Sequence, residues 1–221
     1  VVLARTYEEA QKLYDKYSDN TLGVISDARF PLKSAAKAFG NEVMPEEKPK
    51  HRTDTFGREK CPDAGLQLFR YIRKNDPFVP LIIESSESEN RAKAEAEGFR
   101  FVDKNSKKMS VDLRRLMEEH MGFGDFIFRD PKTHEEIMRI HSLKELQDNI
   151  FNIPNDSMLY HISRNHMSRW LCARAIFPVS AFLKHVTWEK LQDVDAHRQI
   201  IFDAIVQYRH MKNIGVVAVF D

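Results

Sequence analysis

The segment Leu22-Gly23-Val24-Ile25-Ser26-Asp27 is a short apolar run that ends in a carboxylate. Two later apolar runs also end in polar residues: Leu81 to Glu84 is followed by Ser85, and Phe99 to Val102 is followed by Asp103 and Lys104. Between these runs, apolar residues recur at helical spacing. Short strands that alternate with helices are typical of an α/β domain with a parallel sheet.

We predict that this α/β domain covers residues 1–121 and that Gly122 stops its last helix. Its first strand is predicted at Val1 to Ala4, and Thr6-Tyr7-Glu8-Glu9 has the pattern of a capping box that opens the next helix. A stretch at about residues 32–62 is rich in Lys, Glu and Pro and lacks an apolar period, so we predict a mobile insertion there.

Residues 122–221 follow a different pattern, and we predict a smaller, helix-rich α+β unit. Alternating apolar residues at 126–129 and 137–140 flank the turn sequence Asp130-Pro131-Lys132-Thr133, which predicts a hairpin. Three helices are then expected, at about Leu143 to Asn149, at Met158 to Ala175 with a continuation past Pro178, and at Ala196 to Lys212.

The composition excludes some partners and locations. The chain has 34 basic and 33 acidic side chains and a net charge of +1, so we expect neither nucleic acid nor an anionic membrane as a partner. Its apolar runs are far shorter than the roughly 20 residues of a membrane-spanning helix. Two widely separated cysteines, Cys61 and Cys172, fit a reducing compartment, and we expect a cytoplasmic protein.

Both ends of the sequence suggest a piece of a longer protein. The chain begins at Val1 without a methionine and stops directly after the apolar run Gly215 to Phe220. We therefore expect further segments on both sides.

The ends of the predicted strands carry the candidate chemistry. In an open parallel sheet, ligands bind beyond the carboxyl ends of the strands, so Asp27, Ser85 and Lys104 are expected at one edge. A carboxylate, a hydroxyl and an ammonium group at one edge suit phosphoryl transfer. The carboxylate of Asp27 would be the nucleophile, Lys104 would neutralise charge on the phosphoryl oxygens, and Ser85 would donate a hydrogen bond to one of them.

Residues 1–121 resemble the receiver domains of response regulators. The resemblance rests on four segments in the family's order: Ile25-Ser26-Asp27-Ala28-Arg29-Phe30-Pro31, Asp63-Ala64-Gly65-Leu66, Pro80 to Ser86, and Val102-Asp103-Lys104. It implies a flavodoxin-like, doubly wound parallel sheet. Asp27 then matches the phosphoacceptor, Ser85 the hydroxyl that repositions on phosphorylation, and Lys104 the invariant lysine. A sensor histidine kinase or a small phosphodonor would supply the phosphoryl group.

The match departs from the receiver pattern in two respects. Receivers hold Mg²⁺ with an acidic pair that follows their first strand, and the match here begins at their second strand. We expect the missing strand and helix upstream, so that Asp27 would share Mg²⁺ with acidic residues that precede Val1. Asn105 stands where receivers usually have a proline, and this departure, like the insertion, fits a pseudo-receiver.

The second half resembles a region of certain bacterial phosphoenolpyruvate synthase-like proteins. The resemblance rests on the segments Gly122 to Pro131 and Leu159 to Arg174. In those proteins this region joins a receiver-like domain to an ATP-binding domain of the pyruvate phosphate dikinase type. The resemblance implies a regulatory module that controls a downstream phosphotransferase region in the same chain, and it allows a homodimer.

Three functions remain open at this point. The first is a working receiver with its phosphoacceptor at Asp27, and the second is a pseudo-receiver that acts as an unphosphorylated interaction scaffold. The third, an aspartyl phosphatase, is disfavoured because Arg29 stands where the general acid would be, two residues after the nucleophile. We therefore expect this chain by itself not to be catalytic.

Other polar residues have simpler interpretations. Ser86 is predicted to cap the following helix, with Glu89 completing a capping box. His161 and His166 are five residues apart, a spacing that does not place two metal ligands on one face of a helix. The residues Arg164, Asn165, His166 and Arg174 are expected to form buried hydrogen bonds or to contact a downstream domain.

Overall fold

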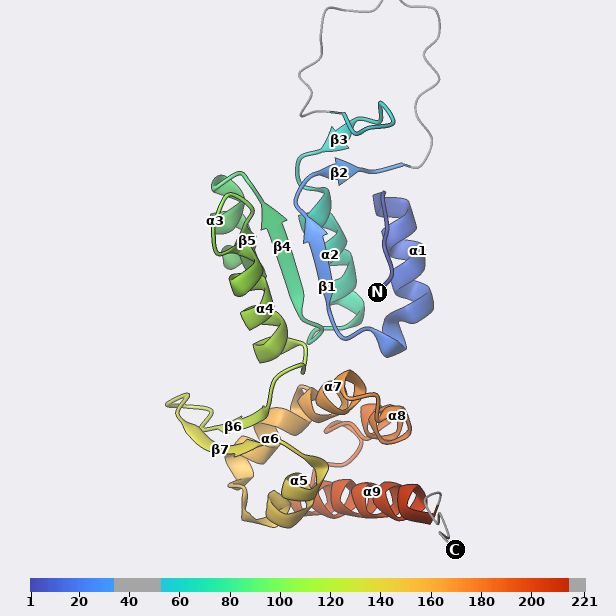
Figure 1. Cartoon of the computed structure of the whole chain (residues 1–221), viewed down its shortest axis with the longest axis vertical. Coiled ribbons are helices and arrows are strands. Elements are labelled where there is room, and N and C mark those ends of the chain that lie inside the picture. Colours follow the sequence, from blue (N-terminus) through green and yellow to red (C-terminus); the bar gives the residue numbers. More distant parts are fainter. Residues whose placement is uncertain (34–52, 215–221) are drawn as a thin grey trace, which may run out of the picture. The chain divides into compact units, whose positions relative to one another are not determined.

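The structure of the protein is a computed structural model that describes residues 1–33 and 53–214. The chain divides into two compact units, Val1–Leu116 and Met117–Asp221 (Figure 1). The first unit is mixed α/β and contains a parallel sheet, as predicted. No helix in the described ranges has the length and apolar character needed to cross a bilayer.

The sheet of the first unit has three parallel strands in the order β1-β4-β5. They are β1 (Val24–Asp27), β4 (Leu81–Ser85) and β5 (Arg100–Asp103). In the register of the sheet, Asp27 pairs with Glu84 and Ser85 pairs with Asp103. The carboxyl ends of all three strands therefore lie at the same edge.

The chain alternates these strands with helices, which are α1 (Tyr7–Tyr17) with the 3₁₀ turn η1 (Ser18–Asn20), α2 (Ala64–Asn75), α3 (Glu89–Ala96) and α4 (Met109–His120). Helix α1 contacts α2, and α2 and α3 contact the sheet. The contacts of α2 reach β1 and β4, and those of α3 reach β4 and β5. Phe69 and Ile72 of α2 and Ile83 of β4 are fully buried, so this core holds the strand ends in place.

Two local predictions in this unit have opposite outcomes. The Thr6 hydroxyl accepts a hydrogen bond from the Glu9 amide and caps α1, as predicted. Val1 to Ala4 are not in a strand, because no strand in the described part of the chain pairs with them.

Most of the predicted insertion lies outside the described residues, but its last part is regular. A short antiparallel ribbon joins β2 (Phe30–Pro31) to β3 (Lys60–Cys61). A bridge between Thr53 and Glu59 precedes it, and the Asp54 carboxylate closes the turn by accepting hydrogen bonds from the Phe56 and Arg58 amides. The Lys- and Glu-rich part of the predicted insertion, within residues 34–52, lies outside the described residues.

The second unit consists of a hairpin and helices (Figure 1). The predicted hairpin is confirmed as β6 (Phe126–Arg129) paired with β7 (Glu136–Ile140). The helices are α5 (Leu143–Asn149) with the 3₁₀ turn η2 (Ile150–Asn152), α6 (Asn155–Ser163), α7 (His166–Ala173), α8 (Phe177–His185) and α9 (Val194–Ile214).

The prediction of one helix from Met158 to Ala175 is wrong. Asn165 adopts a left-handed conformation with φ of 55°, which ends α6 and starts α7 at a new angle. Ala175 has φ of 58° and separates α7 from α8 in the same way. The chain therefore forms three short helices in this stretch.

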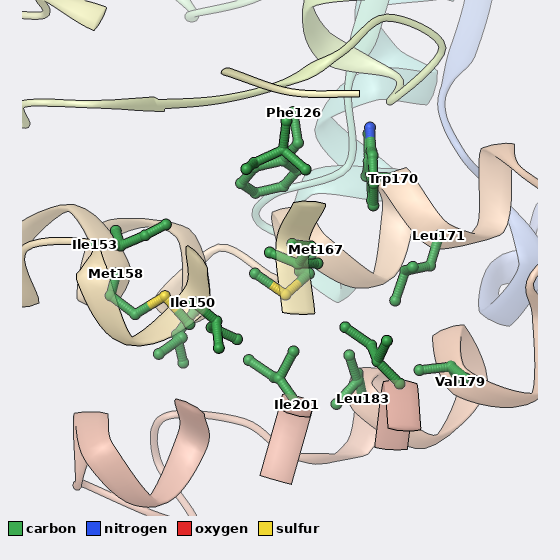
Figure 2. Close-up of a cluster of buried hydrophobic side chains, with 14 of the residues drawn as sticks. Phe126, Ile150, Ile153, Met158, Met167, Trp170, Leu171, Val179, Leu183 and Ile201 are labelled. Atoms are coloured by element: carbon green, nitrogen blue, oxygen red, sulfur yellow. The ribbon is translucent and has the colours of Figure 1, made fainter. Parts of the chain in front are cut away.

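The short helices enclose a core that belongs to the second unit alone. Figure 2 shows side chains from β6, η2, α6, α7, α8 and α9 that point toward one another. The largest fully buried members are Trp170, Phe128, Ile140, Leu146, Ile150 and Met158. A core that contains a tryptophan and draws on every element of the unit gives this unit its own source of stability.

Candidate functional site

Asp27 and Lys104 meet at the carboxyl edge of the parallel sheet. Lys104 directly follows β5, and its ammonium group reaches across β4 and donates to the Oδ1 atom of Asp27 at the end of β1. The side chain of Asp27 is 51% exposed, so its carboxylate is accessible to a reagent from solvent. The structure thus places the predicted nucleophile and the predicted cation in direct contact.

Glu84 is a third charged group at this edge, and the sequence-based reasoning did not include it. Its Oε2 atom lies 4.0 Å from Nζ of Lys104, and its side chain is only 15% exposed. Burial raises the pKa of the Glu84 carboxyl, Lys104 opposes this shift, and the neighbouring charge of Asp27 adds to it. The sequence feature that could have identified Glu84 as a site residue is a carboxylate at the end of the apolar run Leu81 to Ile83.

Ser85 lies near these residues but its hydroxyl points elsewhere. The Oγ atom accepts hydrogen bonds from the Glu87 amide at 3.0 Å and from Nδ2 of Asn90 at 2.9 Å. Its main-chain oxygen accepts a hydrogen bond from the Lys104 amide at 3.0 Å. Among the described contacts, the Ser85 side chain therefore engages the loop before α3 and the first turn of α3, and not the carboxylate of Asp27.

The prediction that Ser86 caps α3 is wrong. The helix begins at Glu89, and Ser88 occupies the capping position without a side-chain hydrogen bond. Ser86 is therefore not the cap. The hydroxyl of Ser85 accepts from the loop instead, because the register of β4 places it at the start of the turn.

The three loops at this edge are tied together by side chains. Arg29, two residues after Asp27, donates to both carboxylate oxygens of Glu87 at 2.8 and 3.2 Å. Asn90 donates to the same carboxylate at 3.3 Å, and Asn105 donates to the Ser86 carbonyl at 2.8 Å. The loops that follow β1, β4 and β5 are thus cross-linked around the site.

A glycine allows the first turn of α2 to approach Asp27. The Gly65 amide donates to the Ala28 carbonyl at 3.0 Å. A Cβ atom on Gly65 would lie 2.3 Å from the Asp27 main-chain oxygen, far inside van der Waals contact. Only glycine fits at this position, and its absence of a side chain fixes where the β1 loop runs.

Among the described residues, Asp27 is the candidate ligand for Mg²⁺. Asp27 offers an exposed carboxylate, the type of ligand that Mg²⁺ prefers, and Mg²⁺ commonly binds through one or two carboxylates while keeping several waters. Within residues 1–33 and 53–214, no group of three or more His, Cys, Asp or Glu side chains is placed to hold a metal ion.

The second unit contains a pair of neighbouring histidines, of which His161 is buried and His166 is partly buried. Their Nδ1 atoms lie 3.1 Å apart, because the break at Asn165 lets His161 at the end of α6 turn toward His166 at the start of α7. The two residues lie on separate helices, so their five-residue spacing does not keep the rings apart. Burial lowers the pKa of His161 from 6.5 to about 4, and it lowers the pKa of His166 still further.

The environment of the histidine pair is aromatic. The His161 ring packs against Phe126, Phe128 and Tyr160, with centroid distances of 4.8, 5.1 and 5.1 Å. Its Nε2 atom is buried without a hydrogen-bond partner among the described atoms. The His161 ring therefore packs among aromatic side chains, and the lowered pKa values leave both rings neutral at neutral pH.

The two segments that carry the second resemblance contact each other. The indole nitrogen of Trp170 donates to the Gly124 carbonyl at 3.1 Å. The guanidinium of Arg174 stacks on the Trp170 ring at 4.0 Å and donates to the carbonyls of Gly122 and Gly124, each at 2.8 Å. Gly122 has φ of 82°, and a Cβ atom there would lie 2.9 Å from the Trp170 backbone. This contact closes the start of the unit onto α7.

Comparisons of the chain with protein-family models, with curated proteins and with solved structures give no match.

Proposed function

We propose that the first unit is a receiver-like signalling domain, with a flavodoxin-like arrangement, in which Asp27 accepts a phosphoryl group. The main support is the contact between the Lys104 ammonium and the exposed Asp27 carboxylate at the carboxyl edge of a parallel sheet. The strand order β1-β4-β5 also supports the proposal, because it places the strands that end near Asp27, Ser85 and Lys104 side by side.

The proposed reaction is a direct transfer to the carboxylate. An oxygen of Asp27 attacks phosphorus in a phosphohistidine or in acetyl phosphate, and the bond from phosphorus to the imidazole nitrogen or to the acetate oxygen breaks. The leaving group departs with the bonding electron pair, and an imidazole takes up a proton. Lys104 stabilises the charge that gathers on the phosphoryl oxygens.

A bound Mg²⁺ ion would neutralise further negative charge on the phosphoryl group, with the Asp27 carboxylate as its ligand among the described residues. The other acidic ligands would come from a segment upstream of Val1. Among the described residues no strand pairs with the second edge of β1, where Ile25 is exposed, and an additional strand would pair there.

The signal would travel from Asp27 through Ser85. A phosphoryl group on Asp27 presents acceptor oxygens, and a serine hydroxyl is a donor for them. To reach the phosphoryl group, Ser85 must leave the Glu87 amide and the Asn90 side chain. That exchange would loosen the loop before α3 and so change the surface near α3.

We further propose that the second unit links this domain to a phosphoenolpyruvate synthase-like phosphotransferase region in the same protein. The support is the resemblance of the segments that Trp170 and Arg174 hold together. A sensor histidine kinase or a small phosphodonor would be the partner of the first unit, the location would be cytoplasmic, and a homodimer is compatible with the proposal.

The test is the intact mass of the full-length protein, including the segment that precedes Val1, after incubation with Mg²⁺ and acetyl phosphate. The proposal predicts a gain of one phosphate, which is about 80 Da, that is lost at alkaline pH and does not appear in Asp27→Asn. A folded protein that gains no phosphate would contradict the proposal and favour a pseudo-receiver scaffold. A gain that persists in Asp27→Asn would place the phosphate on another residue.

A further inference from the structure

Two carboxylates, those of Asp27 and Glu84, lie close to the single ammonium group of Lys104 at the sheet edge. Lys104 donates to Asp27 and lies 4.0 Å from the nearer oxygen of Glu84. Asp27 and Glu84 are paired in the register of β1 and β4, so the position of Glu84 is fixed by the sheet and not by a loop. The two carboxylates and one ammonium carry a net charge of −1 when all three are ionised.

The carboxylates of Glu84 and Asp27 differ in their exposure to solvent. Its carboxylate is mostly buried, whereas that of Asp27 is half exposed. A buried carboxylate gains more from a nearby cation than an exposed one, because solvent screens the exposed pair. Lys104 is thus attracted to Glu84 even though its closer contact is with Asp27. Among the described residues, Lys104 and Asp27 supply the charges that act on Glu84, and α2 and α3, which pack on β4, supply none.

We propose that Glu84 competes with Asp27 for Lys104 and so slows the transfer of a phosphoryl group to Asp27. This inference rests on the proposed function of Asp27. Glu84 acts through Lys104 and through its negative charge, which repels an anionic phosphodonor, and it is therefore a positioning residue. With the Glu84 carboxylate in place, Asp27 would be phosphorylated more slowly than if only Asp27 and Lys104 were present.

The kinetic test compares the rate of phosphorylation of Asp27 by acetyl phosphate at pH 7.5 in three forms of the protein. Glu84→Gln keeps the shape of the side chain and removes its charge, and it is expected to react about fivefold faster, the effect of removing one charge that lies 4.0 Å from Lys104 when water screens the pair. Glu84→Asp, which restores the charge, should bring the rate back toward that of the unmodified protein. Glu89→Gln removes an exposed charge on α3 and should leave the rate unchanged.

The same series separates an electrostatic role from a structural one. A rate that is high without the charge, in Glu84→Gln, and low with it, in Glu84→Asp, is an electrostatic effect, because a change in packing would not follow the charge. Equal rates for the unmodified protein and Glu84→Gln would overturn the inference. A slower Glu84→Gln would also overturn it, since it would mean that Glu84 assists the transfer.

A second measurement does not depend on phosphorylation. The Glu84 carboxyl can be titrated by carbon NMR in the unmodified protein, in Asp27→Asn and in Lys104→Met. Removal of the Asp27 charge should lower the pKa of Glu84, and removal of the Lys104 charge should raise it. If Asp27 accepts no phosphate but both shifts occur, the charge coupling stands and the proposed function fails. If Asp27 is phosphorylated but the Glu84 pKa moves in neither variant, the inference alone fails.

Discussion

A methyl group on Gly65 would lie 2.3 Å from the main-chain oxygen of Asp27, so the first turn of α2 and the residue proposed to carry the phosphate constrain each other. The same methyl group would also lie 2.9 Å from Ile83 in the core and 3.1 Å from the Ala28 backbone. Two of these three neighbours are backbone atoms, which cannot rotate away.

Gly65→Ala is therefore expected to destabilise the first unit by about 1–3 kcal/mol, the usual effect of forcing an extra methyl group into a packed site. The measurement is urea denaturation, with hydrogen exchange of the β4 amides as the probe of unfolding. Lys74→Ala, which changes an exposed residue on the same helix, is the control. Unchanged stability of Gly65→Ala would show that the β1 loop can move aside.

Lys104→Met separates reactivity from stability. Lys104 and Asp27 are both partly exposed, so the loss of their ion pair should cost less than about 1 kcal/mol in the free energy of unfolding, and Glu84, which also loses its neighbouring cation, adds a further cost. The rate of Asp27 phosphorylation should nevertheless fall by tenfold or more, because one cation fewer faces the phosphoryl oxygens. Denaturation and phosphorylation of the same sample provide both values. A large loss of stability with an unchanged rate would reverse the assigned role.

The buried histidine pair makes the second unit sensitive to acid. His161 and His166 have lowered pKa values in the folded state, so they take up protons on unfolding at a pH below about 6.5. Their contribution to stability is complete above that pH and is lost as the pH falls toward 5, by up to about 1.4 kcal/mol per pH unit for each proton taken up.

Tryptophan fluorescence reports this effect, because Trp170 and Trp188 are the chain's two tryptophans and both lie in the second unit. The urea midpoint should fall between pH 7.5 and pH 5.5. The fall should be smaller in His161→Phe, whose ring takes no proton and suits the aromatic neighbours of His161. A midpoint that does not change over this range would contradict the neutral, buried state of the pair.

Arg174 holds the start of the second unit through geometry that lysine lacks. Its guanidinium donates to the carbonyls of Gly122 and Gly124 while stacking on Trp170. Arg174→Met is expected to destabilise the second unit by about 1–3 kcal/mol, and Arg174→Lys should recover less than half of that loss, since an ammonium group lacks the planar fork. Urea denaturation followed by tryptophan fluorescence measures both. Full recovery by lysine would show that charge alone matters.

The three strands of the parallel sheet could be predicted from the sequence to within a few residues, because they are short β-branched runs between helical segments. The strand predicted at Val1 to Ala4 was wrong, and the short ribbon of β2 and β3 was not predicted. The placement of Asp27 and Lys104 at one edge followed from the rule for parallel sheets. The direct contact between them did not, because Lys104 must reach across β4, and the strand order is not encoded in any one segment.

Other features depend on backbone conformation or register. The left-handed residues Asn165 and Ala175 divide what reads as one helix, and neither is a glycine that would have marked the break. Glu84 becomes part of the site only through its pairing with Asp27 across two strands. The orientation of Ser85 depends on Asn90, five residues later, whose amide competes for the hydroxyl.

The most direct test of the central claim locates the phosphoryl group. The protein is phosphorylated with acetyl phosphate and Mg²⁺ and treated with borohydride, which reduces an aspartyl phosphate to homoserine, and its peptides are then mapped by mass spectrometry. We predict homoserine at position 27 and unchanged aspartate at position 27 in a sample without the phosphodonor. An unmodified Asp27 in a folded, phosphodonor-treated protein, or homoserine at another aspartate, would contradict the assignment of Asp27 as the phosphoacceptor.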